Sequence, residues 1–305
     1  MMKSCNRKIF LVLLSVITIG ILEFSVVDNS FTPIVQVEAK IKSKKKVRVK
    51  HHKKKRKEKV YSLATIKLPA GYTYDRLTNA YENKPSKEFI QACMLGVKQN
   101  EFKHSESASD DKTKIDPTKM TRKQSDEITS YTLRLINEAR SYLNLKPWIK
   151  SEGTQRIADD IAQEYTKNKK SVFDPGDHYI EGIVRAAKKN GLNIDNNYIE
   201  DLTGFESTKK MTISELKSEI YDGLIEMIFG YDGGDYSKKS CYTEWLHAGN
   251  LLSNAGHEIN EHDEYSYFGL SISRRGDEYS VHYIGISSFF VTGEGAREAI
   301  GSFKP

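Results

Sequence analysis

Apolar residues recur at intervals of three and four over much of the chain, the spacing that places them on one face of an α-helix. This pattern predicts helices over about 86–98, 125–143, 152–166, 213–229 and 243–252. Another helix is expected to begin in the DPGDH sequence at 174–178 and to end at Asn190. Two alternating segments, 265–273 and 278–291, predict strands joined by a turn at 274–277. Helices around a small, mostly antiparallel sheet form an α+β layered fold.

The N-terminus carries the one apolar run that is long enough to concern a membrane. Lys3, Arg7 and Lys8 precede the uncharged run Ile9–Leu22. As a helix this run would be about 21 Å long, shorter than the roughly 30 Å hydrocarbon core of a bilayer. Such a pattern is typical of a signal peptide. We expect residues 1–39 to be removed, with a retained N-terminal anchor as the alternative.

A strongly basic segment follows the expected cleavage site. Residues 41–60 hold 12 Lys or Arg and one acid, whereas residues 61–305 hold 31 Lys or Arg and 37 Asp or Glu. The net charge of +6 therefore combines a cationic arm, residues 40–60, with an acidic body. The arm has too few apolar residues to fold alone, so we expect it to be disordered.

The arm is expected to bind an anionic cell-wall polymer, because closely spaced cations displace the counterions of a phosphate-rich chain. The residues expected to carry this binding are Lys44, Lys45, Lys46, Arg48, Lys50, Lys53, Lys54, Lys55, Arg56 and Lys57. A solvated spacer is the alternative. We expect no specific binding of nucleic acid.

The rest of the chain divides by polarity. Residues 61–103 predict a small helical unit, residues 104–124 a polar linker, residues 125–291 the main domain and residues 292–305 a C-terminal tail. With 3 cysteines in 305 residues, the chain is not a disulfide-dense miniprotein. Cys93 and Cys241 could form a disulfide, but Cys93 lies on an apolar helical face, which favours a buried thiol.

The segment LINEARSYLNLKPWIKSEGTQRIADDIAQEY, residues 135–165, resembles the opening of the CAP superfamily of cysteine-rich secretory, antigen five and pathogenesis-related proteins. Asn137 and Arg140 match the polar residues of the first helix in that family. YIEDL (198–202) resembles its Gly-Glu-Asn-Leu segment, and EWLHAGNLLS (244–253) its Trp…His…Asn-Leu-Leu segment. IKLPAGYT, IDPTKMT and TEWLHAGNLL further resemble the surface exclusion domain (Sec/PgrA type) of lactobacilli. The resemblance covers about residues 61–290 and implies an α-β-α sandwich.

The resemblance also implies a His-Glu-Glu-His tetrad in a large cleft, which in some family members binds a divalent cation. Its matches are His178, Glu200 and His247. The second acid is left open: Glu244 adjoins the motif, whereas Glu219 and Glu226 occupy the chain order expected for it. One departure is Asp201, which stands where the family has Asn.

The residues themselves point to related chemistry. Glu244 and His247 are separated by three positions, so they are expected on one helical face, where they could bind a metal or orient a base. His178 is expected in the first turn of its helix, where the helix dipole disfavours imidazolium. His178 and His247 with two carboxylates could hold a zinc ion, and a hydrogen-bonded packing pair is the alternative. His282 is expected to be a core histidine with satisfied hydrogen bonds, or else to line the cleft.

These observations predict a secreted protein of a Gram-positive cell surface, with no transmembrane anchor after cleavage. Its arm would bind the wall, and its CAP-like domain would bind a surface polymer, a lipid, a glycan or another cell. One alternative is a metal-assisted hydrolase that uses the tetrad. The other is a structural wall component with a vestigial cleft. No serine-hydrolase elbow, phosphate-binding loop or dinucleotide fingerprint occurs in the sequence.

Overall fold

The computed structural model describes residues 59–176, 178–252, 264–292 and 301–305. The expected signal peptide and the basic residues 44–57 of the arm lie outside the described residues. The described residues from Val60 onward belong to one compact unit. Within it, residues of the predicted small unit, such as Phe89, share a core with residues of the predicted main domain, such as Leu224 and Phe268.

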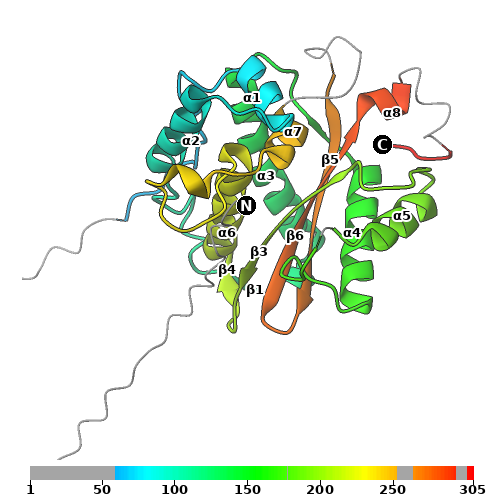
Figure 1. The fold of residues 1–305 in the computed structure, drawn as a ribbon. Coiled ribbons are helices and arrows are strands. Elements are labelled where there is room, and N and C mark those ends of the chain that lie inside the picture. Colours follow the sequence, from blue (N-terminus) through cyan, green and yellow to red (C-terminus); the bar gives the residue numbers. More distant parts are fainter. Residues whose placement is uncertain (1–58, 177, 253–263, 293–300) are drawn as a thin grey trace, which may run out of the picture. The chain divides into compact units, whose positions relative to one another are not determined.

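A four-stranded sheet with the order β2-β5-β6-β3 forms the centre of this unit (Figure 1). β5 (Ser266–Arg275) and β6 (Glu278–Ser287) form an antiparallel hairpin, β3 (Glu200–Glu206) pairs antiparallel with β6, and β2 (Ile149–Lys150) is parallel to β5. A separate two-stranded ladder joins β1 (Lys114–Ile115) and β4 (Met211–Thr212). The sheet is mostly antiparallel, as predicted, and β3 is one of its edge strands.

One face of the sheet is covered by α4 (Glu152–Lys167) and α5 (Ile180–Lys189) (Figure 1). α4 begins where the Ser151 hydroxyl accepts a hydrogen bond from the backbone N–H of Thr154 at 3.1 Å, which satisfies one of the free amides of the first turn. Ile161 of α4 and Ile183 of α5 pack with Ile284 of β6 in a core on this side. This face forms one outer layer of the fold.

The opposite face is covered by α3 (Arg122–Tyr142), α6 (Ile213–Phe229) and α7 (Leu246–Leu252), and α1 (Tyr74–Tyr81) and α2 (Lys87–Gln99) pack on these helices (Figure 1). The short helices η1 (Pro117–Lys119), η2 (Lys239–Cys241) and α8 (Ser288–Thr292) complete the described elements. α3 and α6 each begin with a reciprocal capping box, Thr121 with Gln124 and Thr212 with Glu215. Helices on both faces of the sheet give the predicted α-β-α sandwich.

The segment 104–124, expected to be a polar linker, contains β1 and η1 and the start of α3. Its acidic residues Glu106 and Asp110 lie within 3.5 Å of the side-chain nitrogen of Lys217 on α6. Burial alone would lower the pKa of Lys217, but hydrogen bonds to Asp110 and Glu127 outweigh it and raise the pKa. The segment is therefore held against the body by ion pairs that polarity along the chain does not reveal.

Several element boundaries differ from the sequence prediction. α1 (YDRLTNAY) and β3 (EDLTGFE) were not predicted, because their residues include too few apolar side chains for a clear period. The second predicted strand ends at Ser287, and α8 follows it. Cys93 and Cys241 are both buried and do not form a disulfide with each other, and burial raises the pKa of Cys93 to about 12. None of the described helices is both long and apolar enough to cross a bilayer.

Candidate functional site

The candidate site lies at the start of β3, where the two helical layers meet beside the edge of the sheet. Successive strand residues face opposite sides. Glu200 faces α4, where the Tyr165 hydroxyl donates a hydrogen bond to its Oε2 at 3.0 Å. Asp201 faces α7, where the Asn250 side-chain amide donates to its Oδ1 at 3.2 Å. The edge strand therefore places one buried carboxylate in each layer at the same point.

Glu200 is the centre of the site and is almost completely buried. Its Oε1 lies 2.7 Å from Nδ1 of His282, and its Oε2 lies 2.7 Å from Nδ1 of His178. Burial raises the pKa of Glu200, but the hydrogen bonds and charges of the two histidines outweigh burial and lower the pKa to about 2. Glu200 is therefore ionised at neutral pH, which allows it to accept hydrogen bonds from both rings.

His282 is a fully buried histidine with both ring nitrogens hydrogen-bonded. Its Nε2 lies 2.8 Å from the Ser273 hydroxyl, and its ring packs edge-on against Tyr165 with centroids 4.5 Å apart. This arrangement bears out the expectation of a satisfied core histidine. Ser273, His282 and Glu200 bond in the order of a hydrolytic triad, but all three are buried, so the hydroxyl cannot contact a substrate. Ser273 and His282 position the Glu200 carboxylate.

His178 is held by a loop contact and not by a helix end. α5 begins at Ile180 after the N-cap residue Tyr179, so the prediction that His178 lies in the first helical turn is wrong. The backbone N–H of Tyr179 donates instead to the Tyr165 hydroxyl at 2.8 Å. Tyr165 thus fixes both Glu200 and the chain that carries His178. The His178 side chain is 21% exposed, so the ring reaches solvent.

His247 is the second partly exposed histidine, and Glu244 is its carboxylate partner. Oε2 of Glu244 lies 2.7 Å from Nδ1 of His247, and its Oε1 accepts from the backbone N–H groups of Leu246 and His247. Because α7 begins at Leu246, Glu244 precedes the helix, and the prediction of one helical face for the pair is wrong. Burial lowers the pKa of His247, but Glu244 and the charge of Asp201 outweigh it and raise the pKa.

The structure brings the four residues of the expected tetrad together. The rings of His178 and His247 are 5.9 Å apart between centroids, and Glu200 and Glu244 each hold one of them by its Nδ1. We call His178, Glu200, Glu244 and His247 the histidine cluster. The second acid, left open by the sequence, is therefore Glu244 in this geometry.

The alternative acids Glu219 and Glu226 lie on α6. The charged neighbours of Glu219 are Asp222 and Glu215 of its own helix. Burial and these charges raise the pKa of Glu219 to about 7. Glu226 lies near the buried Tyr283, whose pKa its charge raises. Of the three acids, Glu244 is the one with a hydrogen bond to a histidine of this site among the described residues.

Asp201, the departure from the family pattern, is a further acidic residue of this site. It is buried beside the histidine cluster, and burial raises its pKa to about 6 although the charge of His247 and the hydrogen bond from Asn250 act in the opposite direction. A carboxyl group with this pKa changes its charge near neutral pH. The sequence signal for it was this acid at a position where the family pattern has Asn.

The two polar residues of α3 that match the family pattern hold other segments: Arg140 supports α7, which carries His247, and Asn137 holds the turn after α3. Arg140 is fully buried, and its guanidinium donates to the carbonyl oxygens of Leu251 at 2.7 Å and Lys146 at 2.8 Å. Asn137 exchanges two hydrogen bonds with the backbone of Trp148. Burial lowers the pKa of Arg140 to about 10, so the group stays charged at neutral pH. These contacts tie the end of α7 and the turn after α3 to one helix.

The ring nitrogens and carboxylates of the histidine cluster meet only part of what a zinc ion requires. A carboxylate on the Nδ1 of a histidine is the usual orienting partner of a zinc ligand, and Nε2 of neither exposed ring bonds to a described residue. Catalytic zinc, however, takes three protein ligands. The described parts of the chain contain no group of three or more His, Cys, Asp or Glu side chains placed to hold a metal. The described residues therefore do not fit a resident zinc ion.

A solved structure described as the CAP domain of Enterococcal PrgA is similar to this chain. The two share 24% sequence identity with a TM-score of 0.57, over 79% of this chain and 90% of that chain. No protein-family model and no curated protein matches the sequence. At this identity the likeness establishes the fold: the chain has the CAP-like α+β fold that its sequence resemblance implies.

Proposed function

We propose that this chain is a secreted cell-surface protein that its cationic arm holds on an anionic wall polymer, while its CAP-like domain contacts a surface polymer, a lipid or another cell. The observation that carries the proposal is the separation of charge: 12 cationic residues against one acid in residues 41–60, and a net charge of −6 in residues 61–305. The likeness to the CAP domain of Enterococcal PrgA supports a related surface role.

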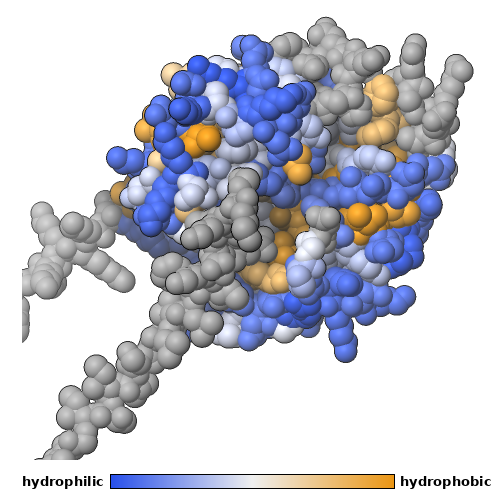
Figure 2. Space-filling view, viewed as in Figure 1, coloured by the Kyte–Doolittle hydropathy of each residue, from blue (hydrophilic) through white to orange (hydrophobic). Residues whose placement is uncertain are grey.

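The charge separation favours two different roles for the two parts. A dense cationic segment binds phosphate polymers by releasing their counterions, and this attraction falls steeply with salt. The acidic body is repelled by the same polymers. Binding through the arm would therefore leave the surface of the CAP-like domain available for a second contact. Figure 2 shows that much of this surface is hydrophilic on the face in view, with separate hydrophobic areas.

The test compares the full chain with two variants on isolated Gram-positive cell walls. One variant lacks residues 41–60, and the other replaces the ten arm residues 44–46, 48, 50 and 53–57 by Gln at unchanged length. A control variant removes ten cationic side chains from exposed positions of the body. We expect both arm variants, but not the control, to lose binding at about 50 mM salt. Binding of the deletion variant with the salt dependence of the full chain would refute the tether.

We infer a second candidate function, a hydrolase, from the histidine cluster. Each partly exposed ring has its Nδ1 held by a carboxylate, so that Nε2 is the nitrogen left for a reactant. One ring could take a proton from water while the other gives a proton to a leaving group. The raised pKa of His247 suits the acid, because it favours the protonated ring.

The hydrolase candidate is tested with the full chain on labelled protein and on nitrophenyl esters, beside His178→Gln and His247→Gln. A rate that falls at least about 100-fold in both variants would support it. A rate that is equal in all three proteins would reject it and leave a vestigial cleft. Zinc that is bound stoichiometrically and lost in both variants would require a further ligand beyond the described residues.

A further inference from the structure

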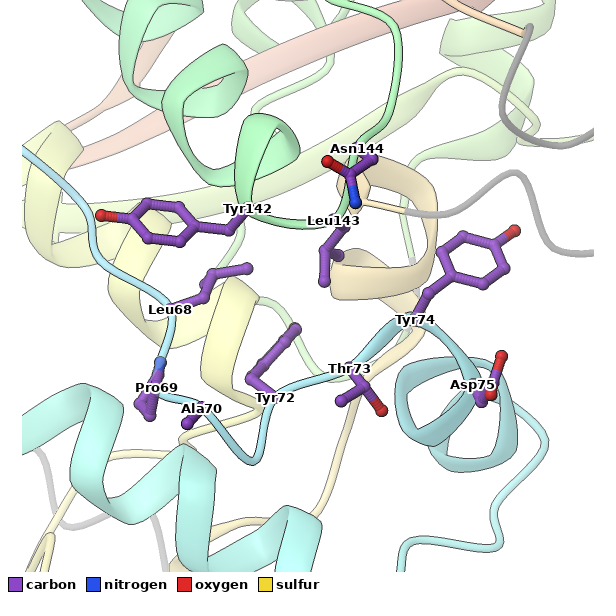
Figure 3. A pocket seen from close by; sticks show the side chains of 10 residues that line it. All are labelled: Leu68, Pro69, Ala70, Tyr72, Thr73, Tyr74, Asp75, Tyr142, Leu143 and Asn144. Atoms are coloured by element: carbon purple, nitrogen blue, oxygen red, sulfur yellow. The ribbon is translucent and has the colours of Figure 1, made fainter.

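A groove of about 460 Å³ lies between the segment 68–75 and the end of α3 (Figure 3). Its lining residues belong to the loop before α1, the first turn of α1, the last residue of α3 and the turn after α3. It shares no residue with the histidine cluster. A volume of this size is within the usual range for small-molecule sites. The groove is therefore a second place at which the CAP-like domain could take a ligand.

The floor of the groove is apolar and held in place. Figure 3 shows the side chains of Leu68, Tyr72 and Leu143 at its middle. The Tyr72 hydroxyl donates to the carbonyl oxygen of Ile228 at 2.6 Å, and its ring packs on Phe89 with centroids 4.9 Å apart. Because buried groups hold both the hydroxyl and the ring of Tyr72, the floor exists before a ligand arrives, which lowers the entropic cost of binding.

The rim of the groove is polar and has unused hydrogen-bonding capacity. The Tyr142 ring, about half exposed, lies on one side, and Asp75 lies on the other (Figure 3). Neither the Asp75 carboxylate nor the Asn144 side-chain amide makes a hydrogen bond to a described residue. Both are exposed planar groups, one an acceptor and the other a donor and acceptor.

This combination suits a sugar ring. A hexose has an apolar C–H face that can pack on Tyr and Leu side chains, and hydroxyl groups around its edge that pair with carboxylate and amide groups. The one charged group among the lining residues is Asp75, which repels phosphate and other anions. The lining therefore favours a neutral sugar over the polyanions expected for the arm.

We propose that the groove binds a neutral sugar unit of a surface glycan through Tyr142, Asp75 and Asn144 over the floor of Leu68, Tyr72 and Leu143. This inference rests on the proposed function, because it names the class of surface polymer that the CAP-like domain contacts. It assigns the arm and the domain to different chemistry: phosphate charges to the arm, and sugar hydroxyls and C–H faces to the groove.

The test titrates the full chain with neutral trisaccharides of glucose, galactose and N-acetylglucosamine, observed by ligand and protein NMR. Three variants remove one rim group each: Tyr142→Ala, Asp75→Asn and Asn144→Gly. The last removes the amide without backbone strain, because Asn144 has φ of 57° and glycine adopts this conformation freely. Tyr236→Ala is the matched control, since Tyr236 is also about half exposed and lies outside the groove.

We expect at least one trisaccharide to bind, and each rim variant to weaken its binding about tenfold, the change produced by one lost contact of about 1.4 kcal/mol. The control should bind as the unaltered chain does. Absence of binding by all three sugars, or equal binding by rim variants and control, would overturn the groove proposal. Because the sugars are uncharged, the sugar titration does not depend on the arm. If no sugar binds but the full chain is retained on walls in the salt assay, the groove proposal fails and the tether proposal remains supported.

Discussion

Two clusters of buried charge in this fold are built alike and have different consequences. In the Lys217 cluster, the ammonium group of Lys217 lies 2.8 Å from Asp110, 2.9 Å from Glu127 and 3.5 Å from Glu106. In the Glu200 cluster, the carboxylate has His178, His282 and Tyr165 as partners. Each has one buried charge with three polar partners. The first joins segment 104–124 to α3 and α6, and the second places a histidine at the surface.

The two clusters differ in the chemistry of the groups around the buried charge. The partners of Lys217 are carboxylates whose charges offset the buried ammonium group. The partners of Glu200 include His178, a titratable ring that reaches solvent and has an Nε2 without a bond to a described residue. Exposure of a partner is not the difference, because the Glu127 side chain beside Lys217 is 38% exposed. The Glu200 charge indicates a candidate reactive site because its exposed partner is an imidazole, a ring that can both take and give a proton. The following predictions test this distinction, from the largest expected effect to the smallest.

Replacing Lys217 by Met should cause the largest loss of stability. It leaves buried carboxylates without their cation, which costs about 3 to 5 kcal/mol of unfolding free energy. Urea denaturation would measure the loss of unfolding free energy. Lys238→Met is the control, because the Lys238 side chain forms an exposed ion pair with Asp235 that is worth about 1 kcal/mol or less. Equal stability of the two variants would show that the Lys217 cluster does not hold the fold.

Glu200→Gln should cost about 3 kcal/mol at pH 7, because the drop of the Glu200 pKa from 4.5 to about 2 stabilises the folded state. The folded pKa lies below the unfolded value, so this contribution is complete above pH 4.5 and is lost as the pH falls toward 2. The difference between variant and unaltered chain should shrink over that window in urea denaturation. Glu82→Gln, at an exposed carboxylate, is the control, and a difference that stays constant with pH would contradict the assignment.

Asp201→Asn should act in the opposite direction and raise stability. Burial raises the Asp201 pKa from 3.8 to about 6, so the ionised group costs about 2 to 3 kcal/mol at pH 8. This cost disappears as the pH falls below 3.8, where the group is protonated in both states. Thermal unfolding at pH 8 and at pH 3.5 would measure the change. A variant that is destabilised at pH 8 would show that the Asp201 charge is needed by its histidine neighbour.

The smallest effects should separate the two histidine partners of Glu200. His282→Gln removes a ring with two buried hydrogen bonds and should cost about 2 kcal/mol. His178→Gln changes a partly exposed side chain and should cost about 1 kcal/mol or less. Urea denaturation of both variants gives the comparison. A larger loss of unfolding free energy for His178→Gln than for His282→Gln would mean that His178 mainly stabilises the fold. That result would weaken the proposed hydrolase role of His178.

The elements that sequence patterns predicted well are those whose apolar residues recur with a clear helical or strand period. The long helices α3, α4 and α6 and the β5–β6 hairpin appear within a few residues of their expected bounds. The pattern failed for β3, whose residues are mostly polar, and for the start of α5, which the Tyr165 hydroxyl sets from another helix. In these cases the decisive contact is distant in sequence.

The candidate site divides in the same way. Residue types and their order along the chain identified His178, Glu200 and His247, because a family resemblance preserves order. Only the folded chain decided that Glu244 holds His247, that Glu200 also holds His282, and that Asp201 is buried beside them. Glu200 and His282 are 82 positions apart and meet because β3 pairs with β6 in one register. Helical spacing is a local property of a sequence, whereas the meeting of two charged groups depends on strand register and on the packing of layers.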